Sequence, residues 1–178
     1  MVLDWRYCME KWICLDCETT GIDPEKDEIL SLSIMNQDGE VLFDEMIKPL
    51  RKTYFPRATA VNGISYDDVK DKPSLIDFKE RLLEIFKNYN VVIGYNVGFD
   101  LGFLSSLFDF YKNYEIIDVM EIYSNYRAEP TEYGGLKWFK LEACASDLGY
   151  KSDNFHNSLE DVKATIYCFN KLKGKLLC

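Results

Sequence analysis

Short apolar runs alternate along this chain with longer segments of helical period, and this alternation is the feature that most constrains the fold. The runs typical of strands cover residues 11–17, 29–35, 40–48, 91–93 and 115–119. Asp38-Gly39 separates the second run from the third, and this dipeptide favours a tight hairpin turn. A hairpin followed by β-α alternation predicts an α/β protein with a mixed central β-sheet and helices packed on it.

Apolar side chains recur at helical spacing in residues 74–89, 99–110, 141–148 and 158–172. Ser74 and Asp77 stand three residues apart at the start of the first segment, as in a capping box. Gly149 directly follows the third segment, where a glycine commonly ends a helix. No repeat, low-complexity tract or linker divides the sequence, so we expect a single domain over residues 1–178.

Length and composition predict an ordinary globular protein. A chain of 178 residues with 47% hydrophobic residues is long enough to bury a core without disulfides or structural metals. Residues 1–6 include charged side chains where a secretory signal needs an apolar run. No later segment approaches the ~20 apolar residues of a membrane span. We therefore expect a soluble, cytoplasmic protein with no membrane partner.

The cysteines and the net charge limit the classes of function that this chain can have. Cysteines stand at positions 8, 14, 17, 144, 168 and 178 without the spacing of a disulfide framework, and we expect reduced thiols that are mostly buried. The net charge of −9 argues against a protein that grips a long duplex through many phosphate contacts. It is compatible with an enzyme that holds a short nucleic-acid end, because bound cations offset ligand carboxylates locally.

Asp16 and Glu18 form the first candidate metal site. They stand two apart at the end of a predicted strand, so their side chains leave the same face. Hard divalent cations prefer such oxygen ligands, and two ions ~3.5–4 Å apart stabilise both the attacking and the leaving oxygen of a phosphoryl displacement. The alternative is an ordinary pair of exposed acids on an edge strand.

Two further segments carry candidate catalytic residues. Asp100 follows a short buried strand and opens a predicted helix, where it could merely complement the helix dipole. His156, the only histidine, stands five residues before Asp161 at the start of another helix. A neutral imidazole takes a proton from water near pH 7. The alternatives are a surface histidine and a capping box between Ser158 and Asp161.

Cys14 and Cys17 form a C-x-x-C pattern, which occurs in redox and zinc sites. On a strand, however, residues three apart point to opposite faces. No second cysteine pair or histidine cluster completes a set of four zinc ligands. We therefore expect no thiol chemistry at this motif.

Three segments of the chain match a known set of motifs. Residues 16–21 read D-x-E-T-T-G, residues 96–100 read N-x-x-F-D and residues 156–161 read H-x-x-x-x-D. In this order they resemble motifs I to III of the DEDDh branch of the DnaQ-like 3′→5′ exonucleases. The resemblance extends over about residues 12–169 and is closest to the proofreading exonuclease subunit of bacterial DNA polymerase III. It implies an RNase H-like fold, two Mg²⁺ or Mn²⁺ ions and release of nucleoside monophosphates from a 3′ end.

The resemblance also implies a role for each matching residue. Asp16, Glu18, Asp100 and Asp161 correspond to the metal ligands of the family, and all four count as catalytic residues. His156 corresponds to the general base that deprotonates the attacking water. Together they form the intact catalytic set of the DEDDh branch.

Substrate contacts follow from the same analogy. Residues 60–64 resemble the family loop over the terminal nucleotide, but Asn62 stands where a histidine often precedes Gly-Ile, so base and sugar contacts differ here. Thr19, Thr20 and Phe103 match substrate-contacting positions, with core packing as the alternative for Phe103. Asp118 matches a position near the site, and we expect it to support the metal ligands at most.

The resemblance favours single-stranded or frayed 3′ ends as substrate, DNA before RNA, and a DNA polymerase subunit as a potential partner. Two alternatives remain open: an RNA-directed exoribonuclease of the same fold, and a non-catalytic adaptor that binds a polymerase. The intact catalytic set weighs against the adaptor. Residues 171–175 form a basic segment that we expect to be a solvated tail.

Overall fold

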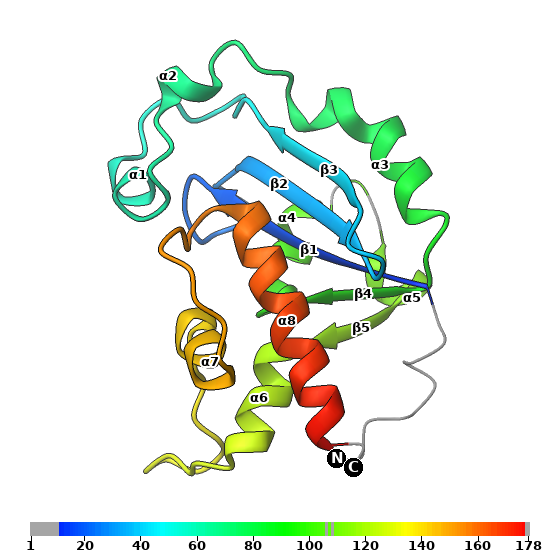
Figure 1. Ribbon diagram of the computed structural model, residues 1–178. Helices are drawn as coiled ribbons and strands as arrows, with labels where there is room; N and C mark the ends of the chain where they lie inside the picture. Colours follow the sequence, from blue (N-terminus) through cyan, green and yellow to red (C-terminus); the bar gives the residue numbers. More distant parts are fainter. Residues whose placement is uncertain (1–10, 106, 108, 177–178) are drawn as a thin grey trace.

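The computed structural model describes residues 11–105, 107 and 109–176, and its centre is a five-stranded mixed sheet (Figure 1). Its strands are β1 (Trp12–Thr19), β2 (Ile29–Asn36), β3 (Val41–Met46), β4 (Val91–Gly94) and β5 (Glu115–Asp118). They are ordered β3-β2-β1-β4-β5, with β1 antiparallel to β2 and parallel to β4. The predicted mixed sheet is confirmed, and β1 lies at its centre.

The hairpin between β2 and β3 forms where the sequence predicts it. Gly39 has a positive φ of 83°, which glycine adopts without steric cost. The Asn36 side chain accepts hydrogen bonds from the backbone N–H groups of Asp38 (3.1 Å) and Glu40 (3.0 Å), and these bonds close the turn.

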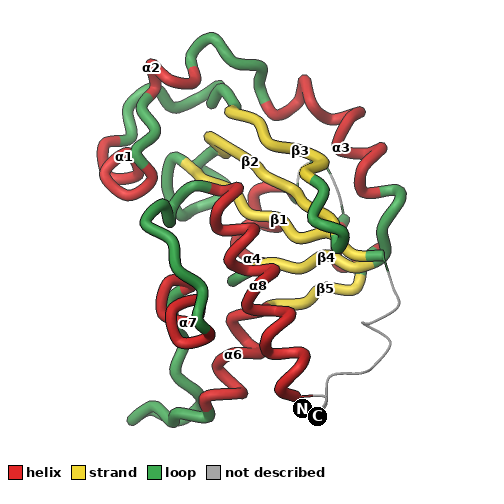
Figure 2. The backbone as a smooth tube through the Cα atoms, in the orientation of Figure 1, coloured by secondary structure: helices red, strands yellow, loops and turns green. Residues whose placement is uncertain are grey.

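Helices cover both faces of the sheet. They are α1 (Pro56–Asn62), α2 (Tyr66–Val69), the 3₁₀ helix η2 (Leu75–Phe78), α3 (Lys79–Phe86), α4 (Val97–Leu104), α5 (Phe110–Asn113), α6 (Val119–Arg127), α7 (Leu141–Leu148) and α8 (Ser158–Leu176). In Figure 2, α8 crosses the strands on one side of the sheet and α4 lies on the other.

Side chains of β1 divide between two hydrophobic cores. Trp12 and Cys14 pack with α6, α7 and α8, whereas Ile13, Leu15 and Cys17 pack with α3 and α4. This alternation is the consequence of strand geometry in a sheet that is covered on both faces. It places every even-numbered residue of β1 on the α8 side.

The helix predicted to open at Ser74 is confirmed, with a 3₁₀ first turn. The backbone N–H and the hydroxyl of Ser74 both donate to the Asp77 carboxylate, at 2.8 and 2.6 Å, as in the predicted capping box. The helices predicted at residues 141–148 and from Ser158 are confirmed as α7 and α8. Helices α1, α2 and α6 were not predicted from the sequence.

The prediction of one continuous helix over residues 99–110 is wrong. Helix α4 ends at Leu104, and Phe110 begins the separate helix α5. The Phe110 ring packs edge-on against Phe86 of α3 at 5.0 Å, so the chain leaves the α4 axis to bury this ring before β5 begins. Phe108, which was part of the predicted apolar face, lies outside the described residues.

Residues 171–175, predicted to be a solvated basic tail, form the last turns of α8, although Lys171 and Lys175 are exposed as predicted. Lys175 donates a hydrogen bond to the Tyr126 hydroxyl at 2.9 Å, and the Lys171 ammonium lies 5.3 Å from the centre of the Tyr167 ring. The first contact attaches the end of α8 to α6, and the second lies within α8 itself.

Cysteines 14, 17, 144 and 168 are free and buried, as predicted. Cysteines 8 and 178 lie outside the described residues, as do residues 1–6. Among the helices that the structure describes, we find none with the length and apolarity needed to cross a membrane.

Two glycines in helical surroundings should respond to alanine with opposite signs. Gly149 ends α7 with a φ of 93°, so Gly149→Ala should destabilise the protein by about 1–2 kcal/mol. Gly174 lies in α8 with open space around its α-carbon, so Gly174→Ala should stabilise by roughly 0.5–1 kcal/mol. Urea unfolding measures both. Equal effects of the two variants would contradict the left-handed cap of α7.

Candidate active site

β1 carries the first two acids into the middle of the fold. Asp16 and Glu18 follow Trp12 and Cys14 on the α8 side of the strand, and both are partly buried. Because β1 lies between β2 and β4, the alternative of exposed edge-strand acids is wrong. Two carboxylates therefore project from the central strand towards the start of α8.

Asp100, on helix α4, is directed at the same strand, β1. It lies in the first turn of α4, only 2% exposed, and its Oδ1 accepts a hydrogen bond from the Cys17 backbone N–H at 2.9 Å. This contact directs the carboxylate at β1. Asp100 therefore does more than complement the dipole of helix α4 with its charge. The connection before α4 turns through Asn96, which has a left-handed φ of 58°.

Asp118 supports this connection from β5. Its Oδ1 accepts hydrogen bonds from the backbone N–H groups of Asn96 and Met120, each at 2.9 Å. The first bond holds the segment that leads into α4, and the second caps the start of α6. Asp118 thus stabilises the backbone from which Asp100 projects.

The start of α8 is anchored to the sheet by serine hydroxyls. The Ser158 hydroxyl lies 3.0 Å from that of Ser31 and 2.8 Å from that of Ser33, both on β2. The alternative of a capping box between Ser158 and Asp161 is therefore wrong. Asn157 acts as the cap instead, because its Oδ1 accepts from the Glu160 backbone N–H at 3.1 Å.

Asp161 has one satisfied oxygen and one unpaired oxygen. Its Oδ2 accepts a hydrogen bond from the backbone N–H of His156 at 3.2 Å. Its Oδ1 is buried and has no hydrogen-bond partner among the described residues. A buried carboxylate oxygen without a partner is costly, so this atom needs a cation or another donor.

The structure brings the predicted residues of the three motifs together. One potential ligand atom from each of Glu18, His156 and Asp161 lies within 4.8 Å of the others. Asp16 is close enough to Glu18, Asp100 and Asp161 for their charges to raise its pKa. All five residues predicted to be catalytic therefore belong to one cluster.

Burial and mutual repulsion raise the pKa values of the β1 acids. Burial raises the pKa of Asp16 well above its usual value, and the charges of Asp100 and Asp161 raise it further. Burial and then the charge of Asp161 raise the pKa of Glu18 to about 7, although a hydrogen bond from Asn62 opposes the change. In the absence of a cation, these carboxylates therefore favour their protonated, neutral forms.

The two helix acids behave in the same way. Burial raises the pKa of Asp100 to about 7 against the opposing hydrogen bonds from Cys17. Burial also raises the pKa of Asp161 to about 6, while the backbone N–H of His156 opposes the change. Perturbations of this size, gathered in one place, are typical of functional sites.

The donor set fits hard divalent cations. Four carboxylates converge with no lysine or arginine among the causes that shift their pKa values. Asp161 belongs to this cluster, and its buried, unpaired Oδ1 is available as an oxygen ligand. Oxygen-rich sites of this kind suit Mg²⁺ or Mn²⁺ rather than thiolate-preferring metals.

His156 lies at the exposed rim of the cluster. It has a left-handed φ of 65°, and its Nε2 lies 3.2 Å from Glu142 Oε1 at the start of α7. A sequence-based prediction missed Glu142, because only the packing of α7 against α8 brings it to the imidazole. This contact orients the ring beside Asp161 and leaves its outer edge open to solvent.

The predicted substrate contacts occupy different environments. The Thr20 hydroxyl donates to Asp27 at 3.1 Å, and the Thr19 hydroxyl donates to the Gly21 carbonyl at 2.6 Å, so both hold the turn after β1. Asn62 donates to the Thr19 carbonyl at 3.2 Å. Asn62 therefore links the end of α1 to the strand that carries the acids.

Three surface hollows meet at the acidic cluster. One of about 600 Å³ includes Glu18, Thr19 and Asn62 in its lining. Another, of about 470 Å³, extends from Glu18 and Asn62 to His156. A third, of about 390 Å³, begins at His156 and Asp161. The cluster is accordingly reached from two sides, along the α1 loop and along α7.

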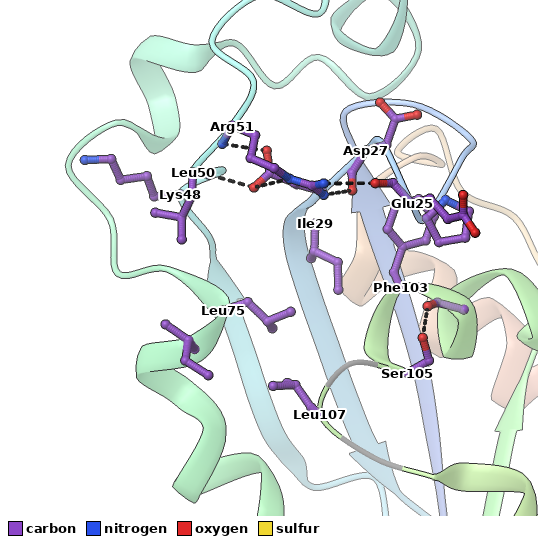
Figure 3. A pocket seen from close by; sticks show the side chains of 14 residues that line it. Glu25, Asp27, Ile29, Lys48, Leu50, Arg51, Leu75, Phe103, Ser105 and Leu107 are labelled. Atoms are coloured by element: carbon purple, nitrogen blue, oxygen red, sulfur yellow. Dashed lines mark hydrogen bonds and ion pairs between the residues drawn. The ribbon is translucent and has the colours of Figure 1, made fainter.

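Phe103 lies away from this cluster. Figure 3 shows it in a separate hollow of about 390 Å³, and none of the four predicted metal ligands lines that hollow. Its ring is buried in the core and contacts Phe99 at 5.0 Å between ring centres. Phe99 is the aromatic residue that lines the hollow beside Glu18.

Arg51, at the edge of the same separate hollow, stabilises the loop after β1 (Figure 3). It donates to the backbone carbonyls of Glu25 at 2.9 Å and Asp27 at 3.1 Å. These contacts fix the segment that follows Thr20, and so help to keep the end of β1 in place.

Cys14 and Cys17 point into different cores, as strand geometry predicts. Burial raises the pKa of each thiol well above its usual value, and the nearby carboxylates raise it further. Such thiols remain protonated and unreactive.

The fold and the carboxylate cluster together define a nuclease-type α/β protein. A family model described as Exonuclease, that of the RNase T family, matches residues 13–169. The chain belongs to this exonuclease family and is a nuclease enzyme.

Similar proteins include exonucleases of several kinds. An uncharacterised exonuclease of Escherichia phage 186 is 28% identical over an alignment of 173 residues that covers 88% of each chain. The DNA polymerase III subunit epsilon of Aquifex aeolicus is 23% identical over 167 residues, covering 93% of this chain and 81% of that protein. RNA exonuclease 4 of Candida glabrata is 29% identical over 165 residues, with 92% and 60% covered.

Solved structures share the fold. E. coli exonuclease I in complex with single-stranded DNA superposes with a TM-score of 0.72 at 20% identity, covering 93% of this chain and 41% of that one. Exonuclease X in complex with 5′-overhanging duplex DNA superposes with a TM-score of 0.70 at 17% identity, covering 92% of both. The predicted RNase H-like exonuclease fold is confirmed, and the chain spans less than half the length of exonuclease I.

The stability of the metal-free protein should decrease as the pH rises. The raised pKa of Glu18 means that the folded chain binds more protons than the unfolded chain between about pH 4.5 and 7, and Asp100 adds to this. In EDTA, we expect a loss on the order of 2 kcal/mol from pH 5 to 8, or roughly 4–8 °C in melting temperature.

Saturating Mg²⁺ should shrink this loss, because the cation favours the charged carboxylates. Glu18→Gln should flatten the pH dependence in EDTA, whereas Glu132→Gln, at an exposed position away from the cluster, should preserve it. A melting temperature in EDTA that does not change with pH would contradict the account of the site.

Proposed function

We propose that this protein is a 3′→5′ exonuclease that releases nucleoside 5′-monophosphates from single-stranded or frayed DNA ends with two Mg²⁺ or Mn²⁺ ions. The observation that supports the proposal best is the convergence of four carboxylates and one histidine, from three distant segments, on a single cluster. Family membership supports the same chemistry.

In this proposal Asp16, Glu18, Asp100 and Asp161 hold the ions. The bound ions would supply charge stabilisation for the attacking and leaving oxygens of the scissile phosphate. The chain's own task is to keep the carboxylates in place, through the Cys17 N–H bond to Asp100 and the anchoring of α8 to β2.

His156 is the proposed general base. The imidazole accepts a proton from a water molecule while the water oxygen bonds to phosphorus. The bond from phosphorus to the 3′ oxygen of the preceding nucleotide breaks, and that oxygen takes a proton from solvent. Glu142 Oε1 orients the imidazole through its contact with Nε2 at 3.2 Å, and the exposed rim position lets His156 return its proton to bulk water.

The terminal nucleotide is placed on the α1 side of the cluster. Asn62 lies beside Glu18 there and would contact the terminal sugar, with Thr19 and Thr20 shaping the turn beneath it. Phe103 would support this hollow through Phe99, which packs on it. Asn62 replaces a bulkier histidine common in the family, so sugar recognition by an amide is a specific feature of this proposal.

A single-stranded or frayed end fits the electrostatics. A net charge of −9 disfavours extended contacts to a duplex, and unpairing an end costs least at a mismatch. DNA is proposed as the substrate because the similar epsilon subunit belongs to a DNA polymerase and exonuclease I is seen with DNA. The similarity to RNA exonuclease 4 makes RNA the alternative, and a polymerase subunit is the proposed partner.

Hydrolysis should depend on Asp100. We expect Mg²⁺ or Mn²⁺ to support stepwise shortening of 5′-labelled single-stranded DNA, EDTA to stop it, and Asp100→Asn to abolish it. Asparagine keeps an oxygen that accepts the Cys17 hydrogen bond, so the variant should fold. A matched RNA oligonucleotide tests the alternative substrate. Wild-type-like activity of folded Asp100→Asn would overturn the assignment.

Removal of the imidazole should slow the reaction without removing the metal ligands. His156→Ala should lower kcat by roughly 10²–10⁴, measured by single-turnover cleavage in Mn²⁺. Lys151→Ala changes an exposed residue on the loop that leads to His156 and serves as the control with unchanged kcat. An unchanged rate for His156→Ala would show that another group accepts the proton.

A further inference from the structure

Trp138 is a large aromatic side chain that is exposed on the surface. It is 60% exposed, whereas Trp12 is only 6% exposed in the core. Among the described residues, Trp138 has no hydrogen bond and no ring contact. An exposed tryptophan of this kind is typical of a binding surface.

The backbone around Trp138 is held firmly. The next residue, Phe139, faces inward: its ring lies edge-on to Tyr123 at 5.2 Å, and its carbonyl accepts a hydrogen bond from the Tyr95 hydroxyl at 2.8 Å. The preceding residue, Lys137, donates its backbone N–H to the Glu129 carbonyl at 2.9 Å. The indole therefore extends outward from a backbone anchored on both sides.

The indole borders a hollow that leads to the catalytic cluster. This hollow of about 390 Å³ has apolar lining from Met120, Trp138, Leu141 and Phe155, and His156 and Asp161 also line it. It lies on the α7 side and shares no lining residue with the hollow beside Asn62. A ligand bound in this hollow can therefore be part of the same molecule as a substrate bound at the carboxylates.

The charges at this hollow suit a nucleic-acid strand. Lys140 lines the hollow, is exposed, and has no ion pair in the described part of the chain. Lys137 stands next to Trp138 and, among the residues that the structure describes, pairs with Glu129 alone, at 3.6 Å. Of the two acids that line the hollow, Glu142 pairs with His156, and Asp161 is a proposed metal ligand. An aromatic plane beside cationic side chains is the arrangement that binds unpaired bases and their phosphates.

We propose that Trp138 stacks on an unpaired base on the 5′ side of the scissile phosphate, with Lys140 contacting the adjoining phosphate. This inference rests on the proposed function, in which the terminal nucleotide occupies the Asn62 side. The preceding nucleotide then leaves the cluster on the α7 side, where the apolar hollow receives it.

Kinetics with two substrates test the proposal. Trp138→Ala should raise KM for a single-stranded DNA octamer by roughly 5- to 100-fold and leave kcat little changed. Hydrolysis of the p-nitrophenyl ester of thymidine 5′-monophosphate, which has no nucleotide on the 5′ side, should be unaffected. Trp138→Phe should restore much of the affinity. Tyr54→Ala, which removes another exposed aromatic ring from a hollow with no catalytic residue, is the control.

The outcomes separate this inference from the proposed function. An unchanged KM for the octamer, or an equal loss on the p-nitrophenyl ester, would overturn the stacking role while leaving the exonuclease intact. If the wild type hydrolyses neither substrate, the proposed function fails. The inference is then judged by whether an octamer in Ca²⁺ quenches tryptophan fluorescence in the wild type and not in Trp138→Phe; equal quenching would overturn it.

Discussion

Repulsion among the carboxylates at the end of β1 is the constraint on which the rest of the structure depends. Burial and neighbouring charges raise the pKa values of all four acids, so the folded chain pays for bringing them together. The surrounding contacts oppose this repulsion: the Cys17 N–H binds Asp100, and Ser158 binds the β2 serines. The folded chain is thereby less stable than it would be without these acids, but it contains a site that attracts divalent cations.

Much of the fold and the site could be predicted from the sequence because the evidence is local. Alternation along β1 places Asp16 and Glu18 on one face, and the resemblance to the DEDDh motifs points to Asp100, His156 and Asp161. The break between α4 and α5 could not be predicted, because it depends on the burial of Phe110 against Phe86. Glu142 was missed for the same reason, since only tertiary packing brings it to His156.

The two sides of the cluster have different chemistry, and this difference gives the site a direction. The side of α1 has the more polar lining and carries Asn62 next to Glu18, whereas the side of α7 has the more apolar lining and carries Trp138. A strand that crosses the carboxylates would place its terminal sugar on the first side and an unpaired base on the second. The orientation proposed for the substrate follows from this asymmetry.

Counting bound metal ions tests the central claim most directly. Titration of the protein with Mn²⁺ in the presence of thymidine 5′-monophosphate, followed by the electron paramagnetic resonance of free Mn²⁺, gives the stoichiometry. The account predicts two ions per chain in the wild type and fewer in Asp16→Asn, a substitution that keeps the shape of the side chain. Absence of Mn²⁺ binding, or equal binding by the variant, would contradict a metal site built on these carboxylates.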